Sequence, residues 1–172
     1  MNNISSILMT TSILTLASIG QAAVIISGDS GLDMSVGAIM SMTALFGPMI
    51  NVGSFILMIP AVMLMGAVVG AINGTGVQML KVVPLVMTLV MSNVVDGFSI
   101  MVTKGQPSVM VGKELQGISK TLVGPLRILP TVVLIVLILL EVLFLRRSRY
   151  GRSLFLAGNN RNAANLCGIN SK

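Results

Sequence analysis

The longest uncharged stretch of the chain is Met34–Leu80, which reads MSVGAIMSMTALFGPMINVGSFILMIPAVMLMGAVVGAINGTGVQML. As a single α-helix, these 47 residues would be roughly 70 Å long, more than twice the hydrocarbon core of a bilayer, which is about 30 Å thick. The stretch must therefore reverse direction. We expect the turn at Asn51-Val-Gly53, because Asn and Gly tolerate the positive φ angles that a reversal needs. This stretch thus predicts two consecutive membrane helices.

The composition excludes a water-soluble enzyme. Hydrophobic residues make up 54% of the 172-residue chain and charged residues 9%, whereas a soluble domain has about 25% charged residues. The chain has no His and one Cys, Cys167, so the usual zinc sites, His-dependent triads and an internal disulfide are excluded. With 3% aromatic residues and no Trp, it lacks stacking platforms for nucleic acid. We expect no catalytic residue, cofactor, metal or nucleic-acid partner.

Five apolar stretches predict an all-α, polytopic membrane bundle over residues 1–145, followed by a cytoplasmic segment over residues 146–172. The stretches are residues 4–27, 35–50, 54–72, 82–102 and 128–145. Turn residues separate them at Gly28–Asp33 and at Asn73–Gly76. The second stretch has only 16 residues, so a partial or broken span is an alternative for it.

The basic residues predict the orientation. Six of the 11 follow Leu145, where no acidic residue occurs: Arg146, Arg147, Arg149, Arg152, Arg161 and Lys172. The positive-inside rule places this end in the cytoplasm, and five spans then place the N-terminus outside. The start, Met-Asn-Asn, lacks a positively charged region, so we do not expect the first span to be a cleaved signal peptide.

Four polar side chains are candidates for a translocation path: Asp33, Asn73, Asn93 and Asp96. Asp33 precedes the second span, where it fits either a helix cap together with Ser35 or a place on the path. Asn93 and Asp96 are three residues apart and share a helix face within the fourth span. An acid inside a membrane is a functional candidate by default, although Asp96 also fits a position near the headgroups.

The C-terminal segment predicts a short helix over residues 161–167. Asn160 is the expected N-cap, and Gly168 the expected residue that ends the helix. A helix of about seven residues is unstable alone, so this one must dock onto something. Its few apolar residues are weak for membrane anchoring, so a protein partner is favoured over the lipid surface.

The chain resembles the ribose-type sugar permeases, which are membrane subunits of ABC importers in the superfamily that also holds branched-chain amino-acid permeases. The resemblance rests most on two elements, Gly31-Leu-Asp-Met-Ser-Val-Gly-Ala38 and the series that runs from Ala157-Gly-Asn159 through Ala163-Ala164 to Gly168-Ile-Asn170. Weaker matches occur in family order at Asn73-Gly74, Met87-Thr-Leu89, Gly105-Gln-Pro107 and Tyr150-Gly-Arg152.

The resemblance implies a permease that passes a small hydrophilic solute by alternating access, with ATP hydrolysis on a separate ATPase subunit. It further implies a coupling helix within Ala157–Asn170 that docks into this ATPase. The implied coupling residues are Ala157, Gly158, Asn159, Asn160, Ala163, Ala164 and Gly168. The implied partners are the ATPase, an extracytoplasmic substrate-binding protein and a second permease copy, in the lipid bilayer of a bacterial cell membrane.

The sequence departs from the family pattern in two ways. Family members are longer, with one more span before the region matching Ile4–Ser27 and several after the coupling segment, so the chain resembles the first half of a permease. The segment Gly28–Asp33 is also one residue longer than the usual pattern. Two alternatives to a working permease therefore remain: a truncated remnant that does not transport, and a membrane scaffold protein. A scaffold would not need the coupling segment.

Overall fold

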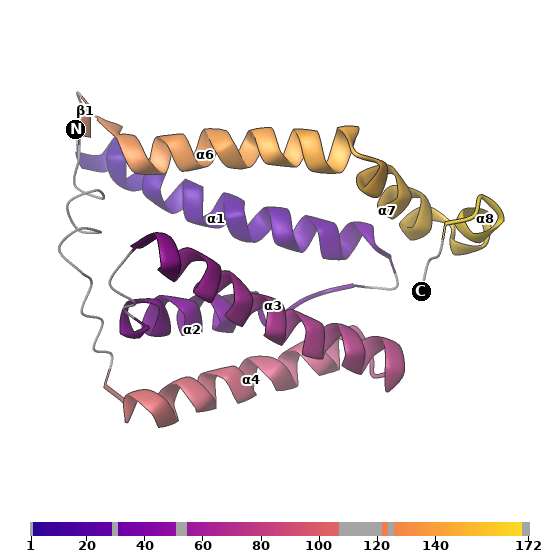
Figure 1. The fold of residues 1–172 in the computed structure, drawn as a ribbon, viewed down its shortest axis with the longest axis horizontal. Helices are drawn as coiled ribbons and strands as arrows, with labels where there is room; N and C mark the ends of the chain where they lie inside the picture. The colour runs from indigo at the N-terminus through magenta and orange to yellow at the C-terminus, as the bar shows by residue number, and fades with distance from the viewer. Residues whose placement is uncertain (1, 29–30, 51–54, 107–121, 124–125, 170–172) are drawn as a thin grey trace. The chain divides into compact units, whose positions relative to one another are not determined.

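The structure is a computed structural model that describes residues 2–28, 31–50, 55–106, 122–123 and 126–169. The chain divides into two compact units. The central unit is Leu32–Gln116, and the terminal unit combines Met1–Gly31 with Gly117–Lys172. Nearly all described residues are helical (Figure 1), which confirms the predicted all-α class. The expected turn at Asn51-Val-Gly53 lies outside the described residues.

Among the described residues, the central unit contains three helices, and the terminal unit contains the first helix of the chain and the C-terminal elements. The central helices are α2 (Val36–Met49), α3 (Phe55–Met79) and α4 (Pro84–Thr103). The terminal unit holds α1 (Asn2–Ile26), a pair of two-residue antiparallel strands β1 (Leu122–Val123) and β2 (Leu126–Arg127), α6 (Ile128–Glu141), the π-helix η1 (Val142–Arg147), α7 (Arg149–Asn159) and α8 (Arg161–Leu166).

Three helices in the described part of the chain are long and apolar enough to cross a membrane. They are Ser6–Ile26 in α1, Leu57–Met79 in α3 and Pro84–Thr103 in α4. The chain is thus a multi-pass membrane protein. The shorter apolar helix α2 falls on the second predicted stretch, and α6 with η1 forms one helical run over the fifth. The count of five spans stays a prediction.

The turn expected at Asn73–Gly76 is wrong. Helix α3 continues through this segment to Met79, and the chain reverses only afterwards, where Lys81 adopts a φ of 54°. In a membrane helix the backbone N–H and C=O groups must be paired internally, so glycines are tolerated there. The buried side chain of Asn73 also donates a hydrogen bond to Ser35, which ties this part of α3 to the start of α2. The next helix begins at Pro84, whose missing N–H is harmless in a first turn.

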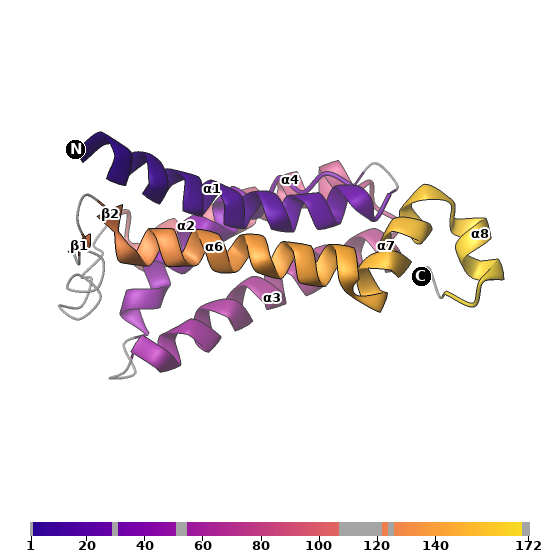
Figure 2. The same ribbon diagram turned by 90° about the horizontal axis from the view of Figure 1, so that it is seen from above.

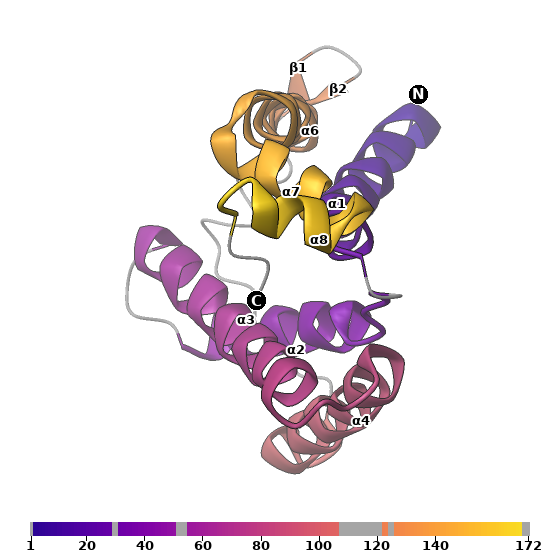
Figure 3. The same ribbon diagram turned by 90° about the vertical axis from the view of Figure 1, so that its right-hand side faces the viewer.

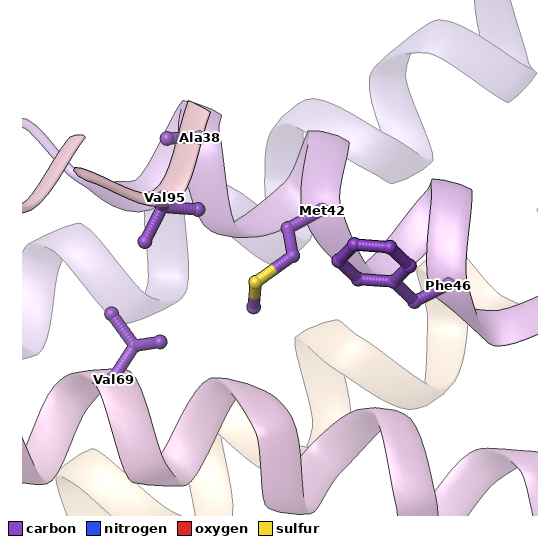
Figure 4. Packing of buried hydrophobic residues seen from close by; sticks show 5 residues of the cluster. All are labelled: Ala38, Met42, Phe46, Val69 and Val95. Atoms are coloured by element: carbon purple, nitrogen blue, oxygen red, sulfur yellow. The ribbon is translucent and has the colours of Figure 1, made fainter. Parts of the chain in front are cut away.

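The core of the central unit lies between its three helices. Ala38, Met42 and Phe46, at successive turns of α2, pack with Val69 of α3 and Val95 of α4 (Figure 4). The ring of Phe46 also meets Phe98 of α4 edge to face, with 5.8 Å between the ring centroids. This arrangement fixes the first turn of α2 relative to α3 and α4, where the polar residues of the unit gather.

Within the terminal unit, α1 and α6 run side by side in the same direction (Figures 1 and 2). The chain then turns from η1 into α7, whose N-cap is Ser148; its Oγ accepts the N–H of Gly151 at 2.9 Å. A side chain at Gly151 would collide with the backbone of Leu145, so glycine is required for α7 to lie against η1. Helix α8 follows after Asn160 and packs on α7 (Figure 3).

Candidate functional site

A buried polar cluster joins the three helices of the central unit at the start of α2. Asp33 Oδ1 accepts two hydrogen bonds from Ser35, one from its backbone N–H at 2.8 Å and one from its Oγ at 2.6 Å. Asn73 Nδ2 of α3 donates to the same Ser35 Oγ at 2.9 Å. Ser35 is fully buried. Ser35 is the N-cap residue of α2 and its side chain makes no cap hydrogen bond, whereas Asp33 accepts from Ser35 and from no N–H of the first helical turn in the bonds described.

Helix α4 joins this cluster through Thr88, which is also buried. The backbone N–H of Met34 donates to Thr88 Oγ1 at 3.1 Å, and the same hydroxyl lies 3.3 Å from the carbonyl oxygens of Leu32 and Leu85. The residues before α2 are therefore held by side chains of both α3 and α4. They belong to the Gly31–Ala38 element that carries the resemblance. Thr88 was not among the residues predicted from the sequence. The only sequence feature that could have indicated it is its place in the weaker Met87-Thr-Leu89 match to the family.

The amide oxygen of Asn73 has no hydrogen-bond partner among the residues that the structure describes. The Ser35 hydroxyl gives its hydrogen to Asp33, so it can only accept from Asn73, and this fixes which end of the amide faces Ser35. Asn73 Oδ1 is then buried, and no donor reaches it within the residues that the structure describes. A buried acceptor without a partner costs about 1 to 3 kcal/mol. An oxygen in this state can accept a hydrogen bond from a further molecule.

The other two path candidates lie elsewhere. Asn93 donates back to the Leu89 carbonyl of its own helix at 3.0 Å, and both Asn93 and Asp96 are exposed in the central unit. The buried residues of α4 are Thr88, Val95 and Ser99. Asn93 and Asp96 are not among them. An acid in an apolar helix is too costly to face lipid. We therefore expect Asp96 to face protein or a water-filled space.

The short helix predicted at the C-terminal end is confirmed. Asn160 caps α8, and its Oδ1 accepts the N–H of Ala163 at 3.0 Å. Gly168 takes a φ of 76° after the last turn, as expected for the residue that ends a helix. The N–H of Ile169 bonds back to the carbonyl of Ala164 at 3.0 Å. The segment is a compact α7–α8 hairpin.

Two small residues of the hairpin are internal packing positions. Ala164 is completely buried. Gly158 lies against the end of α1: an added Cβ would collide with the Ile26 carbonyl oxygen and stand 2.9 Å from the Ile26 carbonyl carbon. Gly28, at a φ of 85°, meets Gly158 from the other side, with its own hypothetical Cβ 3.1 Å from the Gly158 Cα. This pair of glycines lets α7 lie against the end of α1.

The exposed surface of the hairpin carries a residue that sequence reasoning missed. Leu166, in the last turn of α8, is 90% exposed. Asn159, Asn160 and Cys167 are exposed as well, and Ala157 and Ala163 are half-buried. A leucine presented by a capped helix among short polar side chains is a suitable contact for another protein, because its burial would contribute about 1.5 to 3 kcal/mol.

Comparison with protein families gives a match to the family described as branched-chain amino acid transport system, permease component, over residues 3–172. The match spans both units, and it confirms the resemblance to this permease superfamily. No curated protein and no solved structure matches the chain.

Proposed function

The chain belongs to this permease family, and we propose that it is the membrane subunit of a sugar-type ABC importer, or a part of that subunit. The family match supports a role as a permease component of a transport system. The proposal adds the solute class, the ATP-driven mechanism and the direction of transport. It places the chain in a bacterial cell membrane with a second permease copy, an ATPase subunit and a substrate-binding protein that delivers solute from outside.

The polar cluster of the central unit supports a neutral, hydroxylated solute. Among the residues that the structure describes, its side chains are a carboxylate, an amide and two hydroxyls, which suit the hydroxyl groups of a sugar. The unpartnered Asn73 Oδ1 is an acceptor for a solute hydroxyl. In this proposal, Asp33 and Asn73 lie on the translocation path, and Asn93 and Asp96 line a second part of it.

Uptake measurements test the solute class. Vesicles containing the complete transporter are offered labelled ribose, a labelled hexose and labelled leucine, with ATP supplied to the ATPase side. We expect uptake of a sugar that unlabelled leucine does not compete away. Uptake of leucine alone would instead favour a branched-chain amino-acid permease, the other substrate class that the family description names.

The α7–α8 hairpin supports the coupling role. A helix of six residues is unstable unless it is held, and here Asn160, Gly168 and the contact with α7 hold it in place. The Leu166 side chain is then presented outward. We assign ATPase docking to this exposed surface, with Leu166 at its centre. Of the predicted coupling residues, Gly158, Asn160, Ala164 and Gly168 shape the hairpin, whereas Ala157, Asn159 and Ala163 flank its surface.

The contact with α1 supports a mechanism of alternating access. Backbone meets backbone at Gly28 and Gly158, so the hairpin and the end of α1 cannot shift independently without opening this contact. When ATP closes the ATPase subunits, displacement of the docked hairpin would carry α1 with it. Rigid-body movement of this kind is a common form of conformational switching.

A leucine substitution tests ATPase docking. Leu166→Ser removes the exposed apolar contact and leaves the buried side of α8 intact. The ATPase that copurifies with the tagged chain should then bind about tenfold more weakly, because about 1.5 kcal/mol of apolar burial is lost. Leu80→Ser is the matched control, since Leu80 is 75% exposed at the end of α3. Equal losses in both variants, or in neither, would refute the assignment.

Labelling of Cys167 is a second, independent assay of the proposed ATPase contact. It is the one cysteine in the sequence and is exposed next to Leu166. A membrane-impermeant maleimide should label it in inverted vesicles but not in right-side-out vesicles, if the C-terminal segment is cytoplasmic. Bound ATPase should slow the labelling, and Leu166→Ser should restore it. Labelling from the outside would reverse the proposed orientation.

A further inference from the structure

A groove of about 480 Å³ lies between η1 and α7 in the terminal unit. Its lining residues are Leu145, Arg146, Arg152, Phe155, Leu156 and Asn159. It therefore combines two guanidinium groups and an amide with three apolar side chains. This groove shares Asn159 with the edge of the exposed surface around Leu166, but its other lining residues are on η1 and α7 and not on α8.

The two arginines are available to an anion. Neither forms an ion pair within the part of the chain that the structure describes, and both are exposed. Arg152 is also held in place, because its Nη1 donates to the carbonyl oxygen of Arg147 at 2.9 Å. A guanidinium has five N–H donors, so most of those on Arg152 remain for a ligand. A planar, oriented guanidinium is well suited to bind phosphate oxygens.

The groove is at the level where phospholipid headgroups are expected. The helical run through α6 and η1 has no charged residue up to Leu145 except Glu141, and the arginines follow immediately. This change from apolar to basic residues marks the boundary between hydrocarbon and headgroups. No acidic residue occurs after Glu141, so the local field favours a negatively charged ligand.

We propose that this groove binds an anionic phospholipid of the surrounding bilayer. Arg146 and Arg152 hold the phosphodiester, and Asn159 donates to the polar part of the headgroup. Phe155 and the aliphatic side chains contact the first carbons of an acyl chain. A free phosphate would use only the polar half of this lining, whereas a phospholipid uses both halves. The proposal does not depend on the solute or on the ATPase contact.

Lipid retention tests the proposal on the complete chain. The protein is reconstituted in nanodiscs containing equal parts of phosphatidylcholine and phosphatidylglycerol, then released into mild detergent, and its bound lipid is identified by native mass spectrometry. We expect retained phosphatidylglycerol in preference to phosphatidylcholine. The double variant Arg146→Gln/Arg152→Gln should lose this retention by about tenfold or more, since each basic residue near the surface contributes to anionic-lipid binding.

The chain offers a matched control. Arg147→Gln/Arg149→Gln removes the same charge from the same segment, but neither side chain lines the groove. This control removes only diffuse surface attraction, so in a salt concentration that screens such attraction it should change the retention much less than the groove variant does. Equal losses in the two double variants would overturn the proposal in favour of diffuse attraction. Unchanged retention in the groove variant would overturn it as well.

Lipid retention at high salt and in an Arg-to-Lys variant distinguishes a specific lipid site from diffuse attraction. In the wild-type protein, the groove lipid should persist at about 0.5 M NaCl, where diffuse surface attraction is screened; its loss would overturn the proposal without any variant. Arg146→Lys/Arg152→Lys keeps the charge and should recover part of the retention. If the glutamine variant instead retains its lipid and loses affinity for the copurified ATPase, the groove is a protein contact and the lipid assignment is wrong.

Discussion

The contact between α7 and the end of α1 leads to a quantitative prediction for Gly158→Ala. The new methyl group would collide with the Ile26 carbonyl oxygen and would stand 2.9 Å from the carbonyl carbon and 3.3 Å from the carbonyl carbon of Ser27. Carbon atoms in favourable contact are about 3.5 to 4.0 Å apart. The obstacles are backbone atoms, which cannot rotate aside, so α7 must move away from α1.

The expected cost follows from two opposing effects. Overpacking of a close contact costs about 1 to 3 kcal/mol, and we take the upper end because the contact is with backbone. Replacing Gly by Ala in a helix returns up to about 1 kcal/mol. The difference is about 2 kcal/mol, which corresponds to about a thirtyfold change in the equilibrium for local opening.

Hydrogen exchange measured by mass spectrometry is the appropriate assay, because it reports local opening of α7 and α8 without requiring a two-state unfolding of a membrane protein. Amides in peptides covering α7 and α8 should exchange about thirtyfold faster in Gly158→Ala. Peptides from the central unit should be unchanged.

Gly20→Ala is the control. Gly20 is in α1 of the same unit, and nothing lies within 4 Å of an added Cβ. Here helix propensity acts alone, so exchange in α1 should stay the same or slow down. If Gly158→Ala gives the same protection as the wild-type protein, or better, the close approach of α7 to α1 does not hold, and neither does the coupling route through Gly28.

Three further predictions concern single polar side chains. Asp96→Leu should favour membrane insertion yet abolish solute uptake, while Asp96→Asn should keep part of the uptake; retained uptake in the leucine variant would remove Asp96 from the path. Asp33→Ala should accelerate exchange in the first turn of α2 by about tenfold through the loss of two hydrogen bonds, whereas Asp33→Asn, which keeps an acceptor oxygen, should show a smaller effect. Ser148→Ala should cost about 1 kcal/mol of cap energy, seen as faster exchange in the first turn of α7 but not in α6.

Features with local causes could be predicted from the sequence. The cap at Asn160 and the helix end at Gly168 follow from the side chain and the backbone freedom of single residues, and both are present. The start of α4 at Pro84 is of the same kind. The apolar lengths of α1 and α4 could be predicted as well, because bilayer thickness sets how long such helices must be, whereas α3 continues beyond the predicted stretch to Met79.

Features decided by tertiary contacts could not be predicted in this way. Asn73-Gly-Thr-Gly76 has the composition of a turn, but the segment is helical and Asn73 is bonded to Ser35, because a membrane helix tolerates glycine. From the sequence, Asn73, Asn93 and Asp96 were equivalent candidates, each a polar residue in a membrane helix. Packing separates them, since Asn73 is buried in a cluster of three helices whereas the other two are on the exposed face of α4.

The coupling segment shows why a motif of small residues does not by itself reveal what it binds. Gly158 and Ala164 are small because other parts of the terminal unit lie against them, namely the end of α1 and the interior of the hairpin. Large substitutions at these positions would disrupt the hairpin and would abolish ATPase coupling even if neither residue touched the ATPase. Leu166 is the more informative position, because it is exposed and we expect its replacement to leave the fold of the hairpin unchanged. Loss of coupling in Leu166→Ser with normal hydrogen exchange in α7 would therefore locate the ATPase contact, a distinction that no substitution of Gly158 or Ala164 can make.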